Sequence, residues 1–167
     1  MSITICESGL KFGEYANDSV FHAECSSVYQ SLGENVCTVE FILKKQADEF
    51  LLVEAKSGSP QPSNQEDFDK FIQRVYVKFA HAIDLFFSLV TKRLQDESNE
   101  MPVCFKEADF SVAKVKLVLV INGHKIGWLS PINEALKRKM KRQIKTWNLE
   151  VVVMNHELAD EYNLLKH

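Results

Sequence analysis

The stretch from Phe50 to Gly58 constrains the fold of this chain more than any other part of its sequence. It reads FLLVEAKSG, an apolar segment that ends in a glutamate and a lysine two residues apart. Because successive side chains of a β-strand point to opposite faces, Glu54 and Lys56 share one face. The opposite face holds Leu51, Val53 and Ala55. A strand that is apolar on both faces is buried in a sheet, so its two terminal charges are expected to line a cleft.

Hydrophobic patterns on either side of this stretch predict an α/β (α+β) fold. Strands are expected at 3–5, 20–25, 35–44, 50–56, 114–121 and 150–155. Helices are expected at 26–32, from Ser63 to about Arg93, from Ser130 to Trp147 and at 158–165. The first two strands are expected to pair as a hairpin. This order predicts a mixed β-sheet flanked by helices on both faces.

Two of the helix starts have sequence signatures. Ser63 with Glu66 has the spacing of a capping box, and Ser130 precedes Pro131 as an N-cap before a first-turn proline. The long helix and the helix after Ser130 each carry apolar residues at spacings of three and four, which predicts one buried face on each.

Length and composition favour a single globular domain, residues 1–167, with a core at about 20–122 and a basic helix and last strand at 130–155. The hydrophobic content of 46% and charged content of 26% are typical of a soluble protein. No apolar run is long enough to cross a membrane and no signal peptide is recognisable, so a cytoplasmic location is expected. The cysteines lack zinc-binding spacing and are expected to be buried free thiols: Cys6, Cys25, Cys37 and Cys104.

Glu40 adds a second carboxylate to this arrangement. It lies on the strand that precedes the Glu54 strand, and a short polar connection makes the two strands antiparallel neighbours. Two carboxylates held close together repel each other, and a divalent cation such as Mg²⁺ relieves that repulsion. A nearby lysine such as Lys56 can orient an attacking water or neutralise charge that develops at a phosphate. This combination suits the hydrolysis of a phosphodiester bond.

The same residues resemble the PD-(D/E)xK nuclease superfamily, whose fold is restriction-endonuclease-like. In that family an acidic residue on one strand of a hairpin precedes a (D/E)-x-K triplet on the next, and the segment 38–56 is similar to that hairpin. The resemblance covers roughly residues 20–122. It implies that Glu40 and Glu54 bind Mg²⁺ or Mn²⁺ and that Lys56 is the catalytic lysine of a nuclease.

Further positions are suggested by the same resemblance. Many members of the family place another glutamate on the preceding helix, and Glu24 is the candidate here. Some carry a glutamine and a tyrosine on the following helix, which Gln73 and Tyr76 resemble with one residue fewer between them. For all three, the alternative is an ordinary position on the surface of an amphipathic helix.

Two departures from the family pattern keep a second hypothesis open. Glu40 stands where the family usually has aspartate, and the proline before it is absent. The alternative is a catalytically inactive nuclease-fold module that serves as a nucleic-acid-binding or protein-partner subunit. For Glu54 and Lys56 themselves, the alternative is a surface ion pair at the edge of a sheet.

The helix after Ser130 is strongly basic. Residues 101–167 hold 11 Lys and Arg against 7 Asp and Glu, whereas residues 1–100 hold 9 against 16. Six cations on this helix are expected to contact the phosphate backbone of nucleic acid, DNA in the first instance: Lys137, Arg138, Lys139, Lys141, Arg142 and Lys145. A solvated face or an acidic protein partner is the alternative. A homodimer also fits a small nuclease, but the sequence indicates no interface.

Motifs for other chemistries are absent from the sequence. It contains no G-x-S-x-G, no P-loop and no G-x-G-x-x-G. Acyl transfer and nucleoside-triphosphate hydrolysis are therefore disfavoured.

Overall fold

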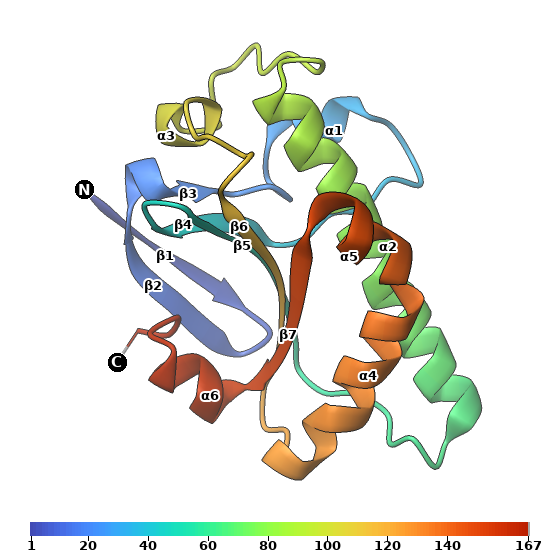
Figure 1. The fold of residues 1–167 in the computed structure, drawn as a ribbon. Helices are drawn as coiled ribbons and strands as arrows, with labels where there is room; N and C mark the ends of the chain where they lie inside the picture. The colour runs from blue at the N-terminus through green and yellow to red at the C-terminus, as the bar shows by residue number, and fades with distance from the viewer. Residues whose placement is uncertain (167) are drawn as a thin grey trace.

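A five-stranded mixed sheet forms the centre of the computed structural model, which describes residues 1–166 (Figure 1). The strands follow the spatial order β3-β4-β5-β6-β7. Their bounds are β3 Val20–Phe21, β4 Phe41–Gln46, β5 Glu49–Lys56, β6 Lys114–Ile121 and β7 Leu149–Asn155. The pairs β3–β4 and β4–β5 are antiparallel, and the pairs β5–β6 and β6–β7 are parallel.

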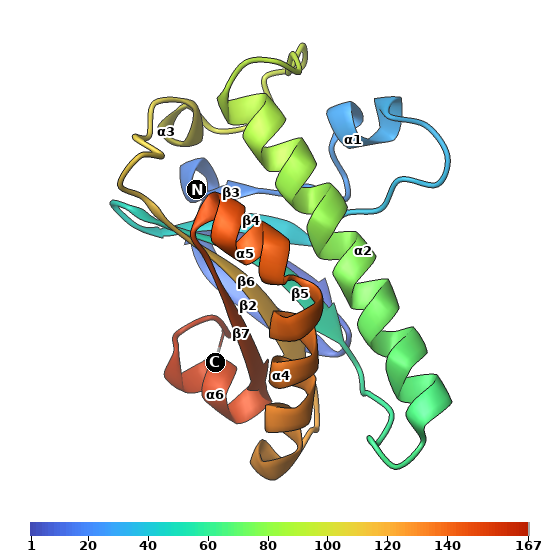
Figure 2. The ribbon, with the colours of Figure 1, turned by 45° about the vertical axis from the view of Figure 1, so that its right-hand side comes forward.

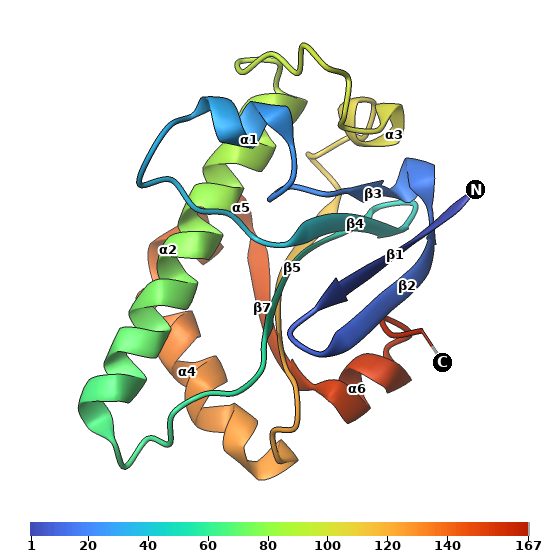
Figure 3. The same cartoon turned by 180° about the vertical axis from the view of Figure 1, so that it is seen from behind.

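Different kinds of structure cover the two faces of this sheet. Helices α2 (Gln65–Val90), α4 (Leu129–Lys139) and α5 (Lys141–Trp147) lie on one face. The other face is covered by a two-stranded hairpin of β1 (Ser2–Glu7) and β2 (Leu10–Ala16) together with α6 (His156–Glu161), as Figure 3 shows from behind. The predicted α+β class is confirmed, but a hairpin shares with one short helix the face that was expected to carry helices.

The predicted alternation along β5 is confirmed. Phe50 and Leu52 pack with the helices of the first face, while Leu51, Val53 and Ala55 pack under the hairpin. Glu54 and Lys56 continue the row of Phe50 and Leu52 and therefore point toward α2. Both faces of β5 are buried because it lies in the middle of the sheet.

Helix α2 confirms the long amphipathic helix, and its 26 residues bury a continuous apolar stripe from Phe68 to Leu89. The predicted capping box is wrong. Asn64 precedes the helix instead of Ser63, and its side-chain amide donates a hydrogen bond to Asp67 at 2.6 Å. At α4, Ser130 lies inside the helix and contacts Glu134 at 3.5 Å, so its predicted N-cap role is also wrong.

The expected pairing of the first strands is wrong for a local reason. Ser8 and Gly9 both have positive φ and close a two-residue turn, so β1 pairs with β2. Val20 and Phe21 pair instead with Leu43 and Ile42 of β4. The sequence interpretation did not recognise the Ser-Gly turn.

Several boundaries also differ from the prediction. The strand expected at 35–44 begins only at Phe41, after an irregular segment, and the basic helix is divided at Met140 into α4 and α5. The last helix lies at 156–161 rather than 158–165, whereas the strand expected at 150–155 is confirmed as β7. A short helix α1 (Ser27–Ser31) confirms the one expected at 26–32, and α3 (Val103–Lys106) was not predicted.

Within residues 1–166, no helix combines the length and apolar character needed to cross a membrane. All four cysteines are free thiols, as expected, but they are not buried. Cys6 and Cys25 are exposed, and Cys37 and Cys104 are half-buried.

Candidate active site

Three glutamates from separate segments meet near the carboxyl end of β5. Phe41 of β4 pairs with Val53 of β5, which brings Glu40, the residue before Phe41, to the side of Glu54. The backbone N–H of Glu24 donates to the carbonyl oxygen of Glu40 at 3.4 Å. Glu24 lies just before the short helix α1, as the sequence predicts. The structure therefore brings together all three acidic residues that the sequence singled out.

Glu54 is the most enclosed member of this cluster, with no exposed side-chain surface. Lys56 Nζ lies 2.5 Å from its Oε1, and Lys78 Nζ lies 3.0 Å from the same oxygen. Because a buried carboxylate is costly without compensation, these two ammonium groups offset the cost of burying Glu54. Glu54 with Lys56 is thus not the surface ion pair that was the alternative.

Glu40 is less well satisfied than Glu54. Its carboxyl is buried, and none of the N–H or O–H groups in residues 1–166 donates to its Oε2. Burial, a hydrogen bond with the Glu24 carboxyl and the charge of Glu54 together raise the pKa of Glu40 to about 8. That hydrogen bond also holds the pKa of Glu24 below its usual range. Two carboxyls can bond only through a proton, so Glu40 carries the proton that the pair shares.

Lys78 of α2 completes the cluster and was missed by the sequence analysis. Its Nζ lies 3.7 Å from Oε1 of Glu40 as well as 3.0 Å from Glu54, so it bridges the two carboxylates. Burial lowers the pKa of Lys78, but the charge and hydrogen bond of Glu54 outweigh burial, and the pKa is raised. A signal existed in the sequence: Lys78 follows Phe71 by seven residues and Val75 by three, which places it on the buried stripe of the helix.

Lys56 connects this cluster to solvent. Its side chain is 30% exposed and lines an open hollow of about 430 Å³. The loop after β5, residues 57–60, forms one wall of the hollow, and Arg74 of α2 stands on another side. The hollow thus has two cationic side chains, Lys56 and Arg74, at its wall, which is an arrangement suited to an anionic ligand.

Gln73 and Tyr76 do not join the cluster. Gln73 is exposed on α2, and the Tyr76 hydroxyl accepts a hydrogen bond from Gln143 of α5 at 3.2 Å. Tyr76 therefore faces α4 and α5, on the other side of α2 from Lys78. The side chain on α2 that contacts the carboxylates is Lys78, two residues after Tyr76.

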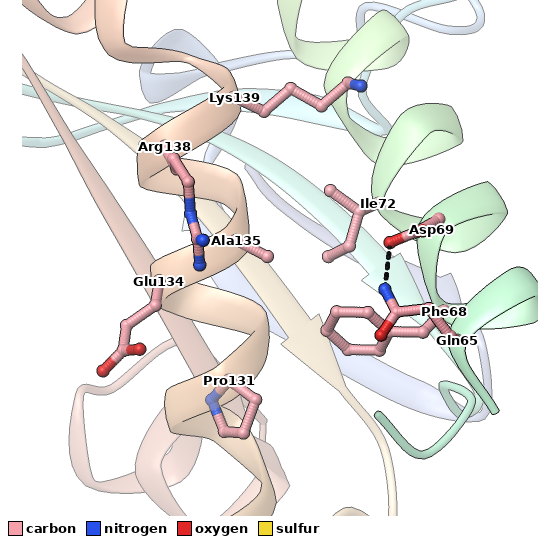
Figure 4. Close-up of a pocket in the computed structure, with 9 residues that line it drawn as sticks. All are labelled: Gln65, Phe68, Asp69, Ile72, Pro131, Glu134, Ala135, Arg138 and Lys139. Atoms are coloured by element: carbon pink, nitrogen blue, oxygen red, sulfur yellow. Dashed lines mark hydrogen bonds between the residues drawn. The ribbon is translucent and has the colours of Figure 1, made fainter. Parts of the chain in front are cut away.

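The six cations of the basic helix are exposed, but they do not form one surface. Lys137, Lys141 and Lys145 line a groove beside β7. Arg138 and Lys139 line a groove between α4 and α2, and Figure 4 shows Lys139 reaching toward α2 across it. Arg142 lines a third hollow with Trp147. Figure 2 shows α1 and the α4–α5 pair on opposite sides of α2.

The carboxyl groups of the cluster are candidate ligands for a hard divalent cation. Three carboxyl groups offer oxygen ligands of the kind that Mg²⁺ and Mn²⁺ prefer, and the buried Oε2 of Glu40 lacks a donor. In residues 1–166 no three His, Cys, Asp or Glu side chains are arranged to hold a metal ion as they stand. The ammonium of Lys78 is the cation that bridges Glu40 and Glu54.

Comparison with known proteins identifies no relative of this chain, because no family model, no curated protein and no solved structure matches it.

Proposed function

We propose that this protein is a metal-dependent nuclease of the PD-(D/E)xK type, with a restriction-endonuclease-like fold, that hydrolyses phosphodiester bonds of nucleic acid. The observation that carries the proposal is the meeting of Glu24, Glu40 and Glu54 with Lys56 and Lys78 beside an open hollow. Burying this many charges in one place costs stability, and clusters of this kind are concentrated at functional sites. A nuclease site would account for the cluster of buried charges.

The three glutamates would hold Mg²⁺ or Mn²⁺. When bound, such a cation polarises a phosphate oxygen and lowers the pKa of a water. Glu40 must lose its proton to become a ligand, so its raised pKa makes cation affinity increase with pH up to about 8. Lys78 then gives up part of its contact with the carboxylates to the cation.

Lys56 and Arg74 act on the substrate side. The Lys56 ammonium, held by Glu54 at 2.5 Å, is oriented toward the hollow where a phosphate would lie. There it stabilises the negative charge that develops on the phosphate as water adds and the ester oxygen leaves with a proton. Arg74, on the wall of the same hollow, offers a planar set of donors for phosphate oxygens.

We retain nucleic-acid binding by the basic helix, but we assign it to three of its six cations. Arg138, Lys139 and Arg142 face α2, whose exposed side includes Lys70 and Arg74. A nucleic acid that lies across α2 contacts these cations and reaches the hollow beside Lys56.

The test is a cleavage assay with Mg²⁺ or Mn²⁺ on double-stranded DNA, single-stranded DNA and RNA. Wild-type protein is expected to cut one of them, and Lys56→Ala and Glu54→Gln are expected to lose the activity. Lys11→Ala is the matched control, because Lys11 is an exposed lysine of β2, on the opposite face of the sheet from α2. Absence of cleavage on all three substrates, or equal cleavage by Lys56→Ala, contradicts the proposal.

The second candidate is a catalytically inactive module of the same type that binds nucleic acid or a protein partner. Lys78 favours it, because this ammonium already contacts both Glu40 and Glu54 without a metal ion. Thermal unfolding with and without Mn²⁺ separates the two candidates. A metal-binding site raises the unfolding midpoint as the cation concentration rises, whereas an inactive module unfolds at the same temperature throughout.

A further inference from the structure

The outer edge of β7 is open. Strand β7 has β6 as its one neighbour in the sheet, and within residues 1–166 no other backbone or side chain bonds to the main chain of 149–154. Alternate N–H and C=O groups along seven residues therefore point away from the sheet. Exposed edges of this kind are ready to pair with another strand, and proteins usually block them.

A groove of about 630 Å³ runs along this edge. Residues 149–153 of β7 form one side, and α4 and α5 form the other through Asn133, Ile144 and three lysines. The groove thus combines unpaired main-chain groups, an apolar floor and a cationic wall. An extended chain of five to seven residues fits beside a strand of this length, at roughly 3.3 Å per residue.

Lys137, Lys141 and Lys145 form the cationic wall of the groove. All three are exposed, and none of them forms an ion pair with any residue in 1–166. They recur every four residues, and hydrogen bonds from Met140 to Leu136 and from Ile144 to Met140 carry the helical path across the break. At about 1.5 Å per residue their spacing is about 6 Å.

This spacing matches an extended peptide. Side chains on one face of a strand are about 6.6 Å apart, so alternate residues of a strand paired with β7 would each meet one lysine. Acidic residues at those positions would satisfy the three uncompensated charges. The residues between them would point to the opposite face, where the neighbouring β7 side chain Val152 is half-buried.

We propose that the β7 edge is a docking site for an extended acidic polypeptide segment, which adds to the sheet as a sixth strand and places alternate carboxylates against Lys137, Lys141 and Lys145. A second copy of this chain fits less well. Antiparallel pairing of two β7 strands would put two rows of three lysines on the same face of the joined sheet. A nucleic-acid strand also carries regular negative charge, but it lacks the alternating N–H and C=O groups that pair with a strand edge.

This assignment gives two sides of the basic helix, α4 and α5, different ligands. Lys137, Lys141 and Lys145 serve a protein partner, and the cations that face α2 are left to nucleic acid. The docking site is independent of the proposed catalytic activity, and the test does not depend on cleavage.

The test uses a fluorescent nine-residue peptide in which glutamate alternates with valine. Wild-type protein is expected to raise its anisotropy and, in the complex, to exchange the backbone amides of 149–155 more slowly. Reversing the three charges with Lys137→Glu, Lys141→Glu and Lys145→Glu is expected to weaken binding about tenfold or more. The matched control combines Arg138→Glu, Lys139→Glu and Arg142→Glu, which makes the same change of charge on the same helices and is expected to bind the peptide as wild type does.

Other occupants give other results. The proposal is overturned if the peptide does not bind at millimolar concentration, or binds without slowing exchange in β7. It is also overturned if a single-stranded oligonucleotide binds in its place and loses affinity in the Lys137 set of variants, which would make the groove a nucleic-acid site. A dimer by sedimentation whose β7 amides are already protected would assign the edge to a second copy.

Discussion

A glutamate contacts a lysine near each end of β5, but the surroundings of the two contacts differ. At the amino end, Glu49 contacts Lys116 at 2.6 Å and accepts a hydrogen bond from the Tyr162 hydroxyl at 3.2 Å. Lys116 also contacts the exposed Glu150 at 3.5 Å, and the hydrogen bond to Glu49 raises the pKa of Lys116. Among residues 1–166, Glu49 has no buried oxygen that lacks a partner, so this end is closed, on the face under the hairpin and α6.

At the carboxyl end, three carboxyls share two ammonium groups on the opposite face. Glu54 is well compensated, whereas Glu40 has a buried oxygen without a donor and a pKa raised to about 8. The difference teaches that a buried Glu–Lys contact is not by itself a site. The buried oxygen of Glu40 without a donor, next to an open hollow, distinguishes the carboxyl end of β5 from the structural contact at the amino end.

Substitution of one lysine near each end of β5 is expected to give the largest difference in cleavage rate. Lys56→Ala is expected to lower the rate of cleavage at least about 100-fold, because the charge beside the phosphate is lost. Lys116→Ala is expected to lower stability but leave the turnover of folded enzyme unchanged. Steady-state cleavage, normalised to the folded fraction, measures both, and an equal loss of turnover at the two positions would remove the distinction between the ends.

Removal of the bridging ammonium tests how the carboxyl end is balanced. Lys78→Met is expected to destabilise the fold by about 1–3 kcal/mol, since Glu40 and Glu54 lose their shared cation. Mn²⁺ is expected to stabilise Lys78→Met more than wild type, because no ammonium competes with it. Urea unfolding with and without Mn²⁺ measures this, and equal Mn²⁺ effects on the two proteins would argue against a cation site at these carboxylates.

Neutralising one glutamate at each end should change stability with opposite signs. Glu49→Gln is expected to cost about 1–2 kcal/mol near pH 8, because it breaks a closed ion pair. Glu40→Gln is expected to stabilise the protein by up to about 1 kcal/mol at the same pH, since glutamine donates to Glu24 without a proton. Urea unfolding of both variants checks the signs. Destabilisation by both would show that Glu40 is satisfied as an ionised carboxylate.

The pH dependence of stability sharpens this comparison. The pKa of Glu40 rises from 4.5 to about 8 on folding, so between these values the folded protein holds a proton that the unfolded chain has lost. The contribution of Glu40 to stability is therefore full below pH 4.5 and is lost as the pH rises to about 8. Glu40→Gln is expected to flatten that decline. A wild-type curve that rises over this range, or a decline unchanged in the variant, would contradict the pKa assignment.

Much of the central fold was predictable because local patterns dominate there. The alternation in 50–56 and the apolar spacing in α2 each identify a buried face, and the pairing of Glu40 with Glu54 follows from a short connection between strands. The hairpin of β1 and β2 was not found, because a two-residue Ser8–Gly9 turn is a weak signal in an otherwise polar stretch. The break at Met140 has no glycine or proline to announce it.

The site was only partly predictable, for a related reason. Sequence spacing places Glu54 beside Lys56, but Lys78 reaches them from another element, and its selection depends on how α2 is rotated over the sheet. The same rotation turns Tyr76 away from the cluster and toward Gln143. The division of the basic helix also depends on tertiary packing, because a helical pattern shows which residues are exposed but not which groove each one faces.

Calorimetric titration with Mn²⁺ at pH 7 tests the central claim most directly, that the carboxyl end of β5 is a cation site. Wild-type protein is expected to bind Mn²⁺ at a saturable site and to release a proton from Glu40, so that the heat of binding varies with the ionisation enthalpy of the buffer. Glu54→Gln is expected to lose this binding, and Glu49→Gln to keep it. A wild-type protein without saturable heat, or a Glu54→Gln variant that binds equally well, would contradict the account.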